Sequence, residues 1–361
     1  MKYLFFVQTE GRGHLTQALS LAEQLRENGH EIIAVIASDN PIRKIPEFFI
    51  TAINCPIYKV TSTYFLINKA GTGIALNRSI IFNLSRLFLY VKSLRTIHSL
   101  YKKYQPNVVI NFYEPLAGLY NLFYGSKIPC FSIGHQFFVE HNSFPKPDNH
   151  SKDQAFLVFY NHLVSCRSKA RLALSFTQED DDIQKKILVC PPLIRSDVKK
   201  ITPRQEGFIL SYILNPGYFE EIKTWASLHK DQQIEAFWDK KEEPEIKIFE
   251  PNLKFHQISG QKFLDLLGNC STYISTAGFD SICEAAYLQK NILMVPTKNH
   301  YEQLGNSLDA VRADLAVTDS FFNIDLALAK QKTRTEVSGQ VFKNWVDSNA
   351  DKILKIITAK Y

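Results

Sequence analysis

Two short turns, one near each end of the chain, carry the residues best suited to chemistry. The first reads Gly11-Arg12-Gly13-His14 and follows the apolar run LFFV. The second lies in the stretch STAGFDSICEA at 275–285, where small residues precede a segment with helical character. A small-residue turn between a strand and a helix leaves backbone amides free to hold an anion. The two turns therefore predict a negatively charged ligand held between two strand–turn–helix units.

His14 opens the helix of the first turn and is the candidate acid–base group. An imidazole titrates near neutral pH and can take a proton from an attacking hydroxyl, which is typically worth about 10²–10⁴-fold in rate. Gly11 and Gly13 let the backbone turn tightly and let a ligand approach. A dinucleotide site is disfavoured, because Thr16 stands where that motif has its third glycine. The alternative is that His14 only caps or packs the first helical turn.

The second turn offers hydroxyls and a carboxylate beside a helix start. A strand ends at Thr276, the chain turns through Gly278, and Ser281 and Glu284 lie on the first turns of the next helix. Free amides and the two hydroxyls would cradle a diphosphate. Glu284, one turn further on, can accept hydrogen bonds from a ribose diol.

An acid and an amide begin the helix after the next strand. The apolar run ILMVP ends that strand, and Glu302 and Gln303 follow it. Side by side at one cleft, the two side chains can hold several sugar hydroxyls. Taken alone, the pair would be interpreted as ordinary surface residues.

In order and spacing, these features resemble the donor-binding region of GT-B glycosyltransferases. The likeness is to the group that contains the UDP-glycosyltransferases and the N-acetylglucosaminyltransferase that completes the peptidoglycan lipid precursor. The N-terminal glycine–histidine turn is similar to theirs as well. The resemblance implies an α/β fold of GT-B type, in which two Rossmann-like domains face each other across a cleft. The matching residues near the second turn are Thr276, Gly278, Ser281, Glu284, Pro296, Glu302 and Gln303.

The resemblance also implies a role for each matching residue. His14 would be the general base that deprotonates the acceptor hydroxyl. Helix N-termini would neutralise the leaving diphosphate, so that no metal and no cofactor is needed. Thr276, Gly278 and Ser281 would bind the donor pyrophosphate. Glu284 would bind the ribose, and Glu302 with Gln303 would bind the transferred sugar.

The activity that follows from the resemblance is that of a metal-independent, inverting glycosyltransferase. It would move a sugar from a nucleotide sugar, with a UDP-sugar expected, to an acceptor hydroxyl such as one of a lipid or a cell-envelope glycan. One alternative is a GT-B epimerase of UDP-N-acetylhexosamine, which would carry a doubled acid, whereas Cys283 precedes Glu284 here. The other is a non-catalytic nucleotide-binding module, which would keep the second turn and tolerate loss of His14.

Three residues near the two turns raise questions of their own. His135 and Gln136 follow a strand of the first half, so they would face the cleft. His135 would then contact the acceptor or act as an alternative base, or else be a satisfied turn residue. Asp280 lies where a diphosphate would bind, and it is expected to point away or to contact a different group. The sequence names no acidic partner for His14.

Alternating strands and helices must position these residues. The 361 residues are 45% hydrophobic, enough for two domains with a core each. Apolar runs of strand length alternate with amphipathic helical stretches, which is typical of parallel sheets covered by helices. A charged, proline-rich break at 189–207 separates two such series. The predicted parts are an acceptor-side domain at 1–190, a nucleotide-sugar domain at 191–338, and a terminal helix at 339–361 that packs back toward the first domain.

Composition limits the partners and the compartment. The net charge of +6 suits an anionic ligand and is too small to indicate nucleic acid. Six scattered cysteines without a C-x-x-C pair predict reduced core thiols in the cytoplasm. The first apolar run is too short for a signal peptide, and no segment is long enough to span a membrane. The acidic run at 180–182 is expected to begin a helix, where successive side chains diverge by about 100° and cannot share a metal ion.

The stretch 77–104 has apolar residues at helical spacing, surrounded by basic side chains. A core-packing helix with one solvated face is the usual interpretation of this pattern. The alternative is a peripheral contact with the inner face of an anionic membrane, which would bring the protein to a lipid-linked acceptor.

Overall fold

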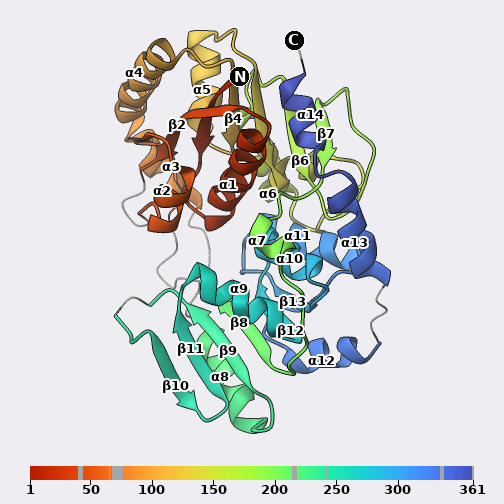
Figure 1. The fold of residues 1–361 in the computed structure, drawn as a ribbon. Coiled ribbons are helices and arrows are strands. Elements are labelled where there is room, and N and C mark those ends of the chain that lie inside the picture. The colour runs from red at the N-terminus through yellow and green to blue at the C-terminus, as the bar shows by residue number, and fades with distance from the viewer. Residues whose placement is uncertain are drawn as a thin grey trace.

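Two sheets of mainly parallel strands form two lobes, which Figure 1 shows one above the other. Helices cover the faces of both sheets, so the expected α/β architecture with two Rossmann-like domains is confirmed. The structure is a computed structural model, and it describes residues 1–39, 44–64, 66, 76–213, 218–240, 242–333 and 337–359.

The first sheet has seven strands, all pairing in parallel, in the order β3-β2-β1-β4-β5-β6-β7. Its strands are β1 (Lys2–Val7), β2 (Glu31–Ser38), β3 (Ile57–Val60), β4 (Val108–Phe112), β5 (Cys130–Gly134), β6 (Ala170–Leu174) and β7 (Ile187–Cys190). Its helices are α1 (Arg12–Glu27), α2 (Glu47–Ile53), α3 (Leu76–Leu84), α4 (Leu87–Tyr104), α5 (Pro115–Tyr124), the 3-10 helix η1 (His135–Glu140) and α6 (Ser151–Val164).

The second sheet also has seven strands, in the order β10-β11-β9-β8-β12-β13-β14, and only β10 runs antiparallel to its neighbour. Its strands are β8 (Ile209–Ile213), β9 (Ile234–Trp238), β10 (Ile246–Glu250), β11 (Leu253–Gln257), β12 (Thr272–Thr276), β13 (Asn291–Val295) and β14 (Val317–Thr318). The helices of this half are α7 (Ser196–Lys199), α8 (Phe219–Leu228), α9 (Gly260–Asn269), α10 (Phe279–Tyr287), α11 (Tyr301–Arg312), α12 (Ile324–Thr333), α13 (Val337–Ser348) and α14 (Lys352–Thr358).

Each sheet reverses its winding direction once, and the functional turns lie at these points. In the first sheet β1 lies between β2 and β4, and in the second β8 lies between β9 and β12. Crevices open outside the carboxyl ends of strands where the winding reverses, because the following helices go to opposite faces. Helix α1 follows β1 and helix α10 follows β12, so each leaves its sheet beside such a crevice.

The two domains share one apolar core. Leu21 and Leu25 of α1, Phe279 and Ile282 of α10, and Ile353 of α14 belong to a single cluster of buried residues. Burial of apolar surface contributes about 25 cal/mol per Å², so this shared cluster favours direct packing of the domains against each other. In Figure 1 the region around α7 and α10 joins the two lobes.

The predicted break at 189–207 contains more regular structure than the sequence indicated. Strand β7 extends to Cys190 and pairs with β6, and α7 follows before the second sheet begins. A strand of four residues at the edge of a sheet, followed at once by Pro191 and Pro192, is too short to show a clear pattern in the sequence.

The helix predicted to start at the acidic run is wrong. Residues 180–182 precede a turn, in which Asp182 and Ile187 form an isolated antiparallel bridge. The Asp181 carboxylate accepts a hydrogen bond from the Val189 backbone at 2.8 Å, and the Asp182 carboxylate accepts one from the Lys185 backbone at 3.0 Å. Aspartate can stabilise a turn in this way as readily as a helix start, so the residue type alone did not decide between them.

The C-terminal helices reach the first domain. The Trp345 indole of α13 donates to the Ser175 carbonyl at 3.1 Å, and the Tyr3 hydroxyl of β1 donates to the Ile357 carbonyl at 3.4 Å. Figure 1 shows α14 beside the upper lobe, although the chain leaves the lower lobe at α12.

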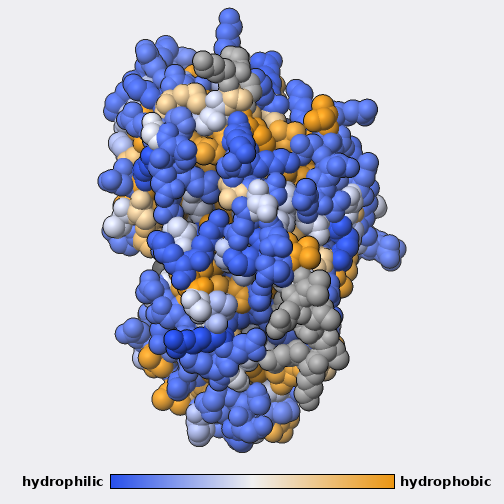
Figure 2. All heavy atoms as spheres, turned by 45° about the vertical axis from the view of Figure 1, so that its right-hand side comes forward, coloured by the Kyte–Doolittle hydropathy of each residue, from blue (hydrophilic) through white to orange (hydrophobic). Residues whose placement is uncertain are grey.

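All six cysteines are free thiols. None of the helices in the described ranges combines the length and apolar character needed to cross a bilayer. On the face shown in Figure 2, hydrophilic residues predominate and hydrophobic ones form mostly small groups.

Candidate functional site between the domains

The carboxyl ends of strands from both sheets meet between the domains. Among the hydrogen bonds that cross this contact, the Gln17 amide donates to Asp280 Oδ1 at 2.8 Å, and the Gln136 amide donates to Glu302 Oε1 at 3.1 Å. Residues separated by most of the chain are thus brought to one site. This is where ligands bind in open α/β sheets.

His14 lies on the first turn of α1 and is nearly buried, with 9% of its surface exposed. Its ring stacks on Tyr113 with centroids 5.6 Å apart, and its Nδ1 lies 3.3 Å from Gln17 Oε1. Burial lowers the pKa of His14 to about 4, outweighing the hydrogen bond that His14 donates to Gln17. The imidazole is therefore neutral near pH 7 and able to accept a proton.

The two glycines of the first turn do not form the tight turn that the sequence predicted. Gly11 has an extended backbone as the N-cap of α1, and Gly13 lies within the helix, so neither needs the left-handed conformation of a tight turn. A Cβ at Gly11 would meet no atom within 4 Å, whereas one at Gly13 would lie 2.1 Å from Asp280 Oδ2. Gly13 is required by the close approach of the second domain.

Asp280 points across the cleft at the start of α1. Its carboxylate accepts the hydrogen bond from Gln17 and approaches the backbone of Gly13. Burial, together with the neighbouring Glu284, raises the pKa of Asp280 to about 6, against the lowering effect of the bond from Gln17. This location explains how an acid can stand on the first turn of α10: its side chain is turned to the other domain.

The second turn presents the start of α10 to the cleft. Thr276 ends β12, and Gly278 is the N-cap residue of α10, with no side chain of its own to cap that helix. A Cβ at Gly278 would meet nothing within 4 Å. Ser281 follows on the first turn and is half-buried. Uncapped amides, a small N-cap residue and nearby hydroxyls suit a diphosphate group.

Glu284 forms a buried ion pair that the sequence did not indicate. Arg195, which precedes α7, donates from Nε and Nη2 to the two carboxylate oxygens of Glu284, at 2.5 and 2.6 Å. The side chain of Glu284 is 7% exposed and that of Arg195 is 23% exposed. Two-point contacts of this kind hold a carboxylate in one orientation. The segment that links the domains thereby fixes the glutamate at the donor turn.

The acid and the amide at the start of α11, Glu302 and Gln303, make contacts with different parts of the protein. Glu302 faces the first domain, where Gln136 contacts it. Gln303 stabilises its own loop, because its Oε1 accepts from the Thr297 backbone at 2.9 Å and its backbone nitrogen donates to His300 Nδ1 at 3.3 Å. Glu302 therefore faces the first domain, while Gln303 shapes the loop from which it projects.

We expect Glu302→Gln to raise the melting temperature at about pH 8 and to change it little at about pH 5. Burial raises the pKa of Glu302 from 4.5 to about 7, and Asp280 raises it further. Between these two values the folded protein binds more protons than the unfolded chain, so this carboxyl stabilises the fold at low pH and loses that effect as the pH rises through about 7. A neutral amide avoids the charge and should contribute on the order of 1–3 kcal/mol above that pH.

Thermal unfolding followed by circular dichroism at both pH values measures this effect. Glu242→Gln, at an exposed loop position, is the matched control. An equal change of melting temperature at both pH values would contradict the buried, protonated state of Glu302.

His135 is fully enclosed at the domain contact. Its ring stacks on Phe279 of α10 with centroids 4.0 Å apart, and its Nδ1 donates to the Leu174 carbonyl at 2.7 Å. Its Nε2 is buried, without a hydrogen-bond partner in the described residues. Burial lowers the pKa of His135 to about 4. The predicted cleft location is observed, but Phe279 covers the ring on one side.

Several site residues were not found from the sequence. Gln17 lies three residues after His14 on the same helix, a spacing that places two side chains on one face and so offered a signal. Arg195 lies in the linker, where nothing pointed to it. Glu114, at the end of β4, accepts from Ser62 and from the Leu116 backbone while its other oxygen is buried without a partner, and burial raises its pKa to about 7.

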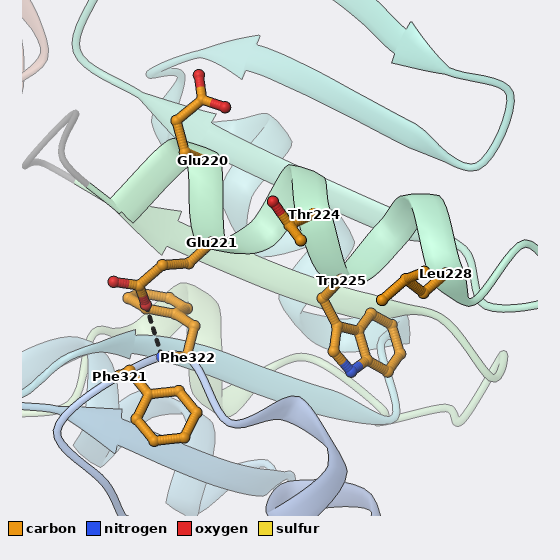
Figure 3. Close-up of a pocket in the computed structure, with 7 residues that line it drawn as sticks. All are labelled: Glu220, Glu221, Thr224, Trp225, Leu228, Phe321 and Phe322. Atoms are coloured by element: carbon orange, nitrogen blue, oxygen red, sulfur yellow. Dashed lines mark hydrogen bonds between the residues drawn. The ribbon is translucent and has the colours of Figure 1, made fainter.

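A separate pocket of about 430 Å³ lies away from this site. Figure 3 shows it between α8 and the segment before α12, where the Glu221 carboxylate accepts from the Phe322 backbone at 2.9 Å. Trp225 and Leu228 make its wall largely apolar. The pocket lies beside the core that contains α8 and α12. Helices α9 and α10 pack instead into the core that is shared with the first domain. None of the predicted site residues lines the pocket.

In the described ranges, His, Cys, Asp and Glu side chains nowhere gather in groups of three that could hold a metal ion.

Comparisons with known proteins agree with this arrangement. The profile described as Glycosyl transferase family 1 matches residues 1–330. No curated protein matches the sequence significantly. The solved glycotransferase of kitacinnamycin is similar with 15% identity and a TM-score of 0.64, over 98% of this chain and 99% of that chain. The spinosyn rhamnosyltransferase SpnG, solved with thymidine diphosphate, has 11% identity and a TM-score of 0.63, over 99% and 100%. MurG of Acinetobacter baumannii has 12% identity and a TM-score of 0.57, over 99% of both chains. These structures confirm the expected GT-B fold.

Proposed function

The chain belongs to glycosyl transferase family 1 and is a GT-B glycosyltransferase that acts on nucleotide sugars, and from this premise we propose that it is a metal-independent, inverting enzyme. Its donor is a nucleoside-diphosphate sugar, with UDP as the expected nucleotide, and its acceptor is a hydroxyl of a lipid or a cell-envelope glycan. SpnG, a structural neighbour, has been solved with thymidine diphosphate and with an aglycone. This supports a cleft that takes a diphosphate on one side and an acceptor on the other.

In the proposed reaction the acceptor oxygen attacks the anomeric carbon while His14 Nε2 takes its proton. The bond from the anomeric carbon to the diphosphate breaks, and its electrons leave with the nucleoside diphosphate, so a single displacement inverts the anomeric centre. The α10 N-terminus stabilises the departing charge, together with the hydroxyls of Thr276 and Ser281. Glu284 binds the ribose and Glu302 the sugar.

The observation that carries the proposal is the contact between the first turns of α1 and α10. His14 lies on the first turn of α1, and Gln17 of the same helix donates to Asp280 on the first turn of α10 at 2.8 Å. A base on one side and a diphosphate site on the other are what transfer from a nucleotide sugar needs.

A thermal-shift screen with UDP-, dTDP- and GDP-sugars tests the donor side, because a ligand that binds the folded state raises the melting temperature by mass action. We expect one nucleotide series to stabilise the protein, with UDP-sugars first. If no nucleotide sugar raises the melting temperature, the proposal is contradicted. Conversion of UDP-N-acetylhexosamine without any acceptor would instead support an epimerase.

We propose in addition that the enzyme works in the cytoplasm, at the inner face of an anionic membrane. The stripe predicted at 77–104 forms α3 and α4, and only part of it faces the core: Leu94 is buried, whereas Ile81 is 69% exposed, Leu84 59% and Phe88 70%. The basic side chains Arg78, Lys92 and Arg95 are exposed on the same two helices, α3 and α4. Apolar side chains bordered by positive charge suit the headgroup region of anionic lipids.

Vesicle sedimentation tests this surface. We expect the protein to bind phosphatidylglycerol vesicles and not phosphatidylcholine vesicles, and Ile81→Ser with Phe88→Ser to weaken binding roughly tenfold. The matched control is Phe159→Ser, which removes another phenylalanine that is 65% exposed, on α6. Equal binding by the double variant and the control would refute the membrane role of α3 and α4.

A further inference from the structure

The N-terminus of α1 is approached by a carboxylate from the second domain. Its N-cap is Gly11, no side chain caps it, and its first turn holds no acidic residue. A carboxylate at a helix N-terminus interacts favourably with the helix dipole, and here Asp280 of α10 takes that place. The absent Cβ of Gly13 makes the approach possible, since it would lie 2.1 Å from Asp280 Oδ2.

The chemistry of Gln17 fixes the direction of the hydrogen bonds between Asp280 and His14. Gln17 Nε2 donates to Asp280 Oδ1 at 2.8 Å, because a carboxylate only accepts. The amide oxygen of Gln17 then faces His14 Nδ1 at 3.3 Å and can itself only accept. Nδ1 must therefore carry the hydrogen of the neutral ring, and Nε2 is left with the lone pair that a general base needs.

We propose that Asp280 is a positioning residue for the base, which it reaches through Gln17 from the opposite domain, so that it orients His14 and stabilises its protonated form. This inference rests on the proposed function of His14. It supplies the acidic partner that the sequence did not reveal, and it makes the donor-binding helix control the acid–base group.

Charged groups on every neighbouring element affect Asp280. Glu284 lies on its own helix, Arg195 approaches from the linker, Glu302 belongs to α11, and His14 and Gln17 belong to α1. The two glutamates oppose ionisation of Asp280, whereas Arg195 favours it. With its pKa raised to about 6, Asp280 loses its charge as the pH falls below that value. We expect kcat to fall there in the wild type.

Asp280→Asn and Gln17→Met test the relay by kinetics. The amide oxygen introduced by Asp280→Asn can still accept from Gln17, so the contact remains while the charge is lost. We expect kcat to fall at least about 10-fold for both variants, with the donor KM nearly unchanged, and the decline below about pH 6 to disappear in Asp280→Asn. Glu179→Gln is the matched control, because it neutralises another carboxylate at the domain contact, which accepts from Arg312 at 2.8 Å. Its kcat should equal that of the wild type.

Moving the carboxylate from position 280 to position 17, and the amide from 17 to 280, should restore kcat. In Gln17→Glu with Asp280→Asn the carboxylate is placed directly at His14 Nδ1, and the new amide can donate to it. We expect kcat to return to within about fivefold of the wild type, whereas Gln17→Glu alone, with two facing carboxylates, should remain impaired. A role limited to holding the domains together would leave Asp280→Asn active and give nothing to rescue.

A measurement without turnover separates this inference from the proposed function. Nitrogen-15 NMR of the histidine rings, with His14→Gln used to assign the signal, should show Nδ1–H and a bare Nε2 for His14 in the wild type and in Asp280→Asn. Gln17→Met should give a mixture of tautomers. An unchanged His14 signal in Gln17→Met, or unchanged kcat in both single variants, would overturn the relay. If the wild type transfers no sugar at all, the proposed function is wrong. The NMR result on the His14 tautomer would still hold.

Discussion

His14→Ala is expected to lower kcat by about 10²–10⁴-fold while the Kd of the nucleotide-sugar donor changes by less than about twofold. The imidazole is the group at the start of α1 that can take a proton, and its low pKa keeps it neutral under assay conditions. Donor contacts are expected from α10 and α11 on the other domain, so the affinity should not depend on this ring. Single-turnover kinetics and calorimetry with the same donor measure the two quantities separately.

His162→Ala is the matched control for this variant, since it removes another histidine, whose side chain is 62% exposed on α6. It should retain the kcat of the wild type. If His14→Ala turns over at nearly the normal rate, the base is a different residue, and His135 is the next histidine to test.

Glu284→Ala should raise the Kd of the donor roughly 10- to 100-fold, because hydrogen bonds to a charged group contribute about 1.5–3 kcal/mol. The two-point contact with Arg195 fixes the carboxylate of Glu284 beside the donor turn, so its remaining acceptor positions are held ready for a ribose diol. The same change leaves the guanidinium of Arg195 without its carboxylate. We therefore expect a lower melting temperature as well, which must be separated from the loss of binding.

A double variant makes that separation. Arg195→Ala with Glu284→Ala removes both charges, which avoids a buried unpaired ion and should recover part of the melting temperature. The donor affinity should stay low, because the ribose contact is still missing. Calorimetry and thermal unfolding on the wild type, Glu284→Ala and the double variant measure both effects. If affinity returns together with stability, the weak binding of Glu284→Ala came from disorder, and the ribose role of Glu284 is wrong.

Local patterns were sufficient to predict the fold and the place of the site. Parallel strands buried on both faces leave continuous apolar runs, as in β1 and β12, and the helices between them leave an amphipathic period. The glycine–histidine turn and the second turn each follow such a run, which is enough to locate the two halves of a cleft. The short strand β7 was missed, because its four residues run directly into the proline-rich break that was predicted from residue 189.

The partners of the site residues depend on contacts between distant parts of the chain. Gln17 and Asp280 are 263 positions apart, and Arg195 and Glu284 are 89 apart. No periodicity or propensity links such positions, because their approach is set by how two independently formed sheets pack together. The same holds for Gly13, whose missing side chain has its reason in the other domain.

What the sequence determined by itself was therefore the α/β fold, the two turns, and the identity of His14 and Glu284 as chemically capable residues. The tertiary structure alone decided that Asp280 faces α1, that Arg195 holds Glu284, and that part of the apolar stripe on α3 and α4 is exposed. The physical reason is the range of the forces involved. Backbone geometry and burial act along a few neighbouring residues, whereas charge pairing and close approach across a cleft exist only after the domains have met.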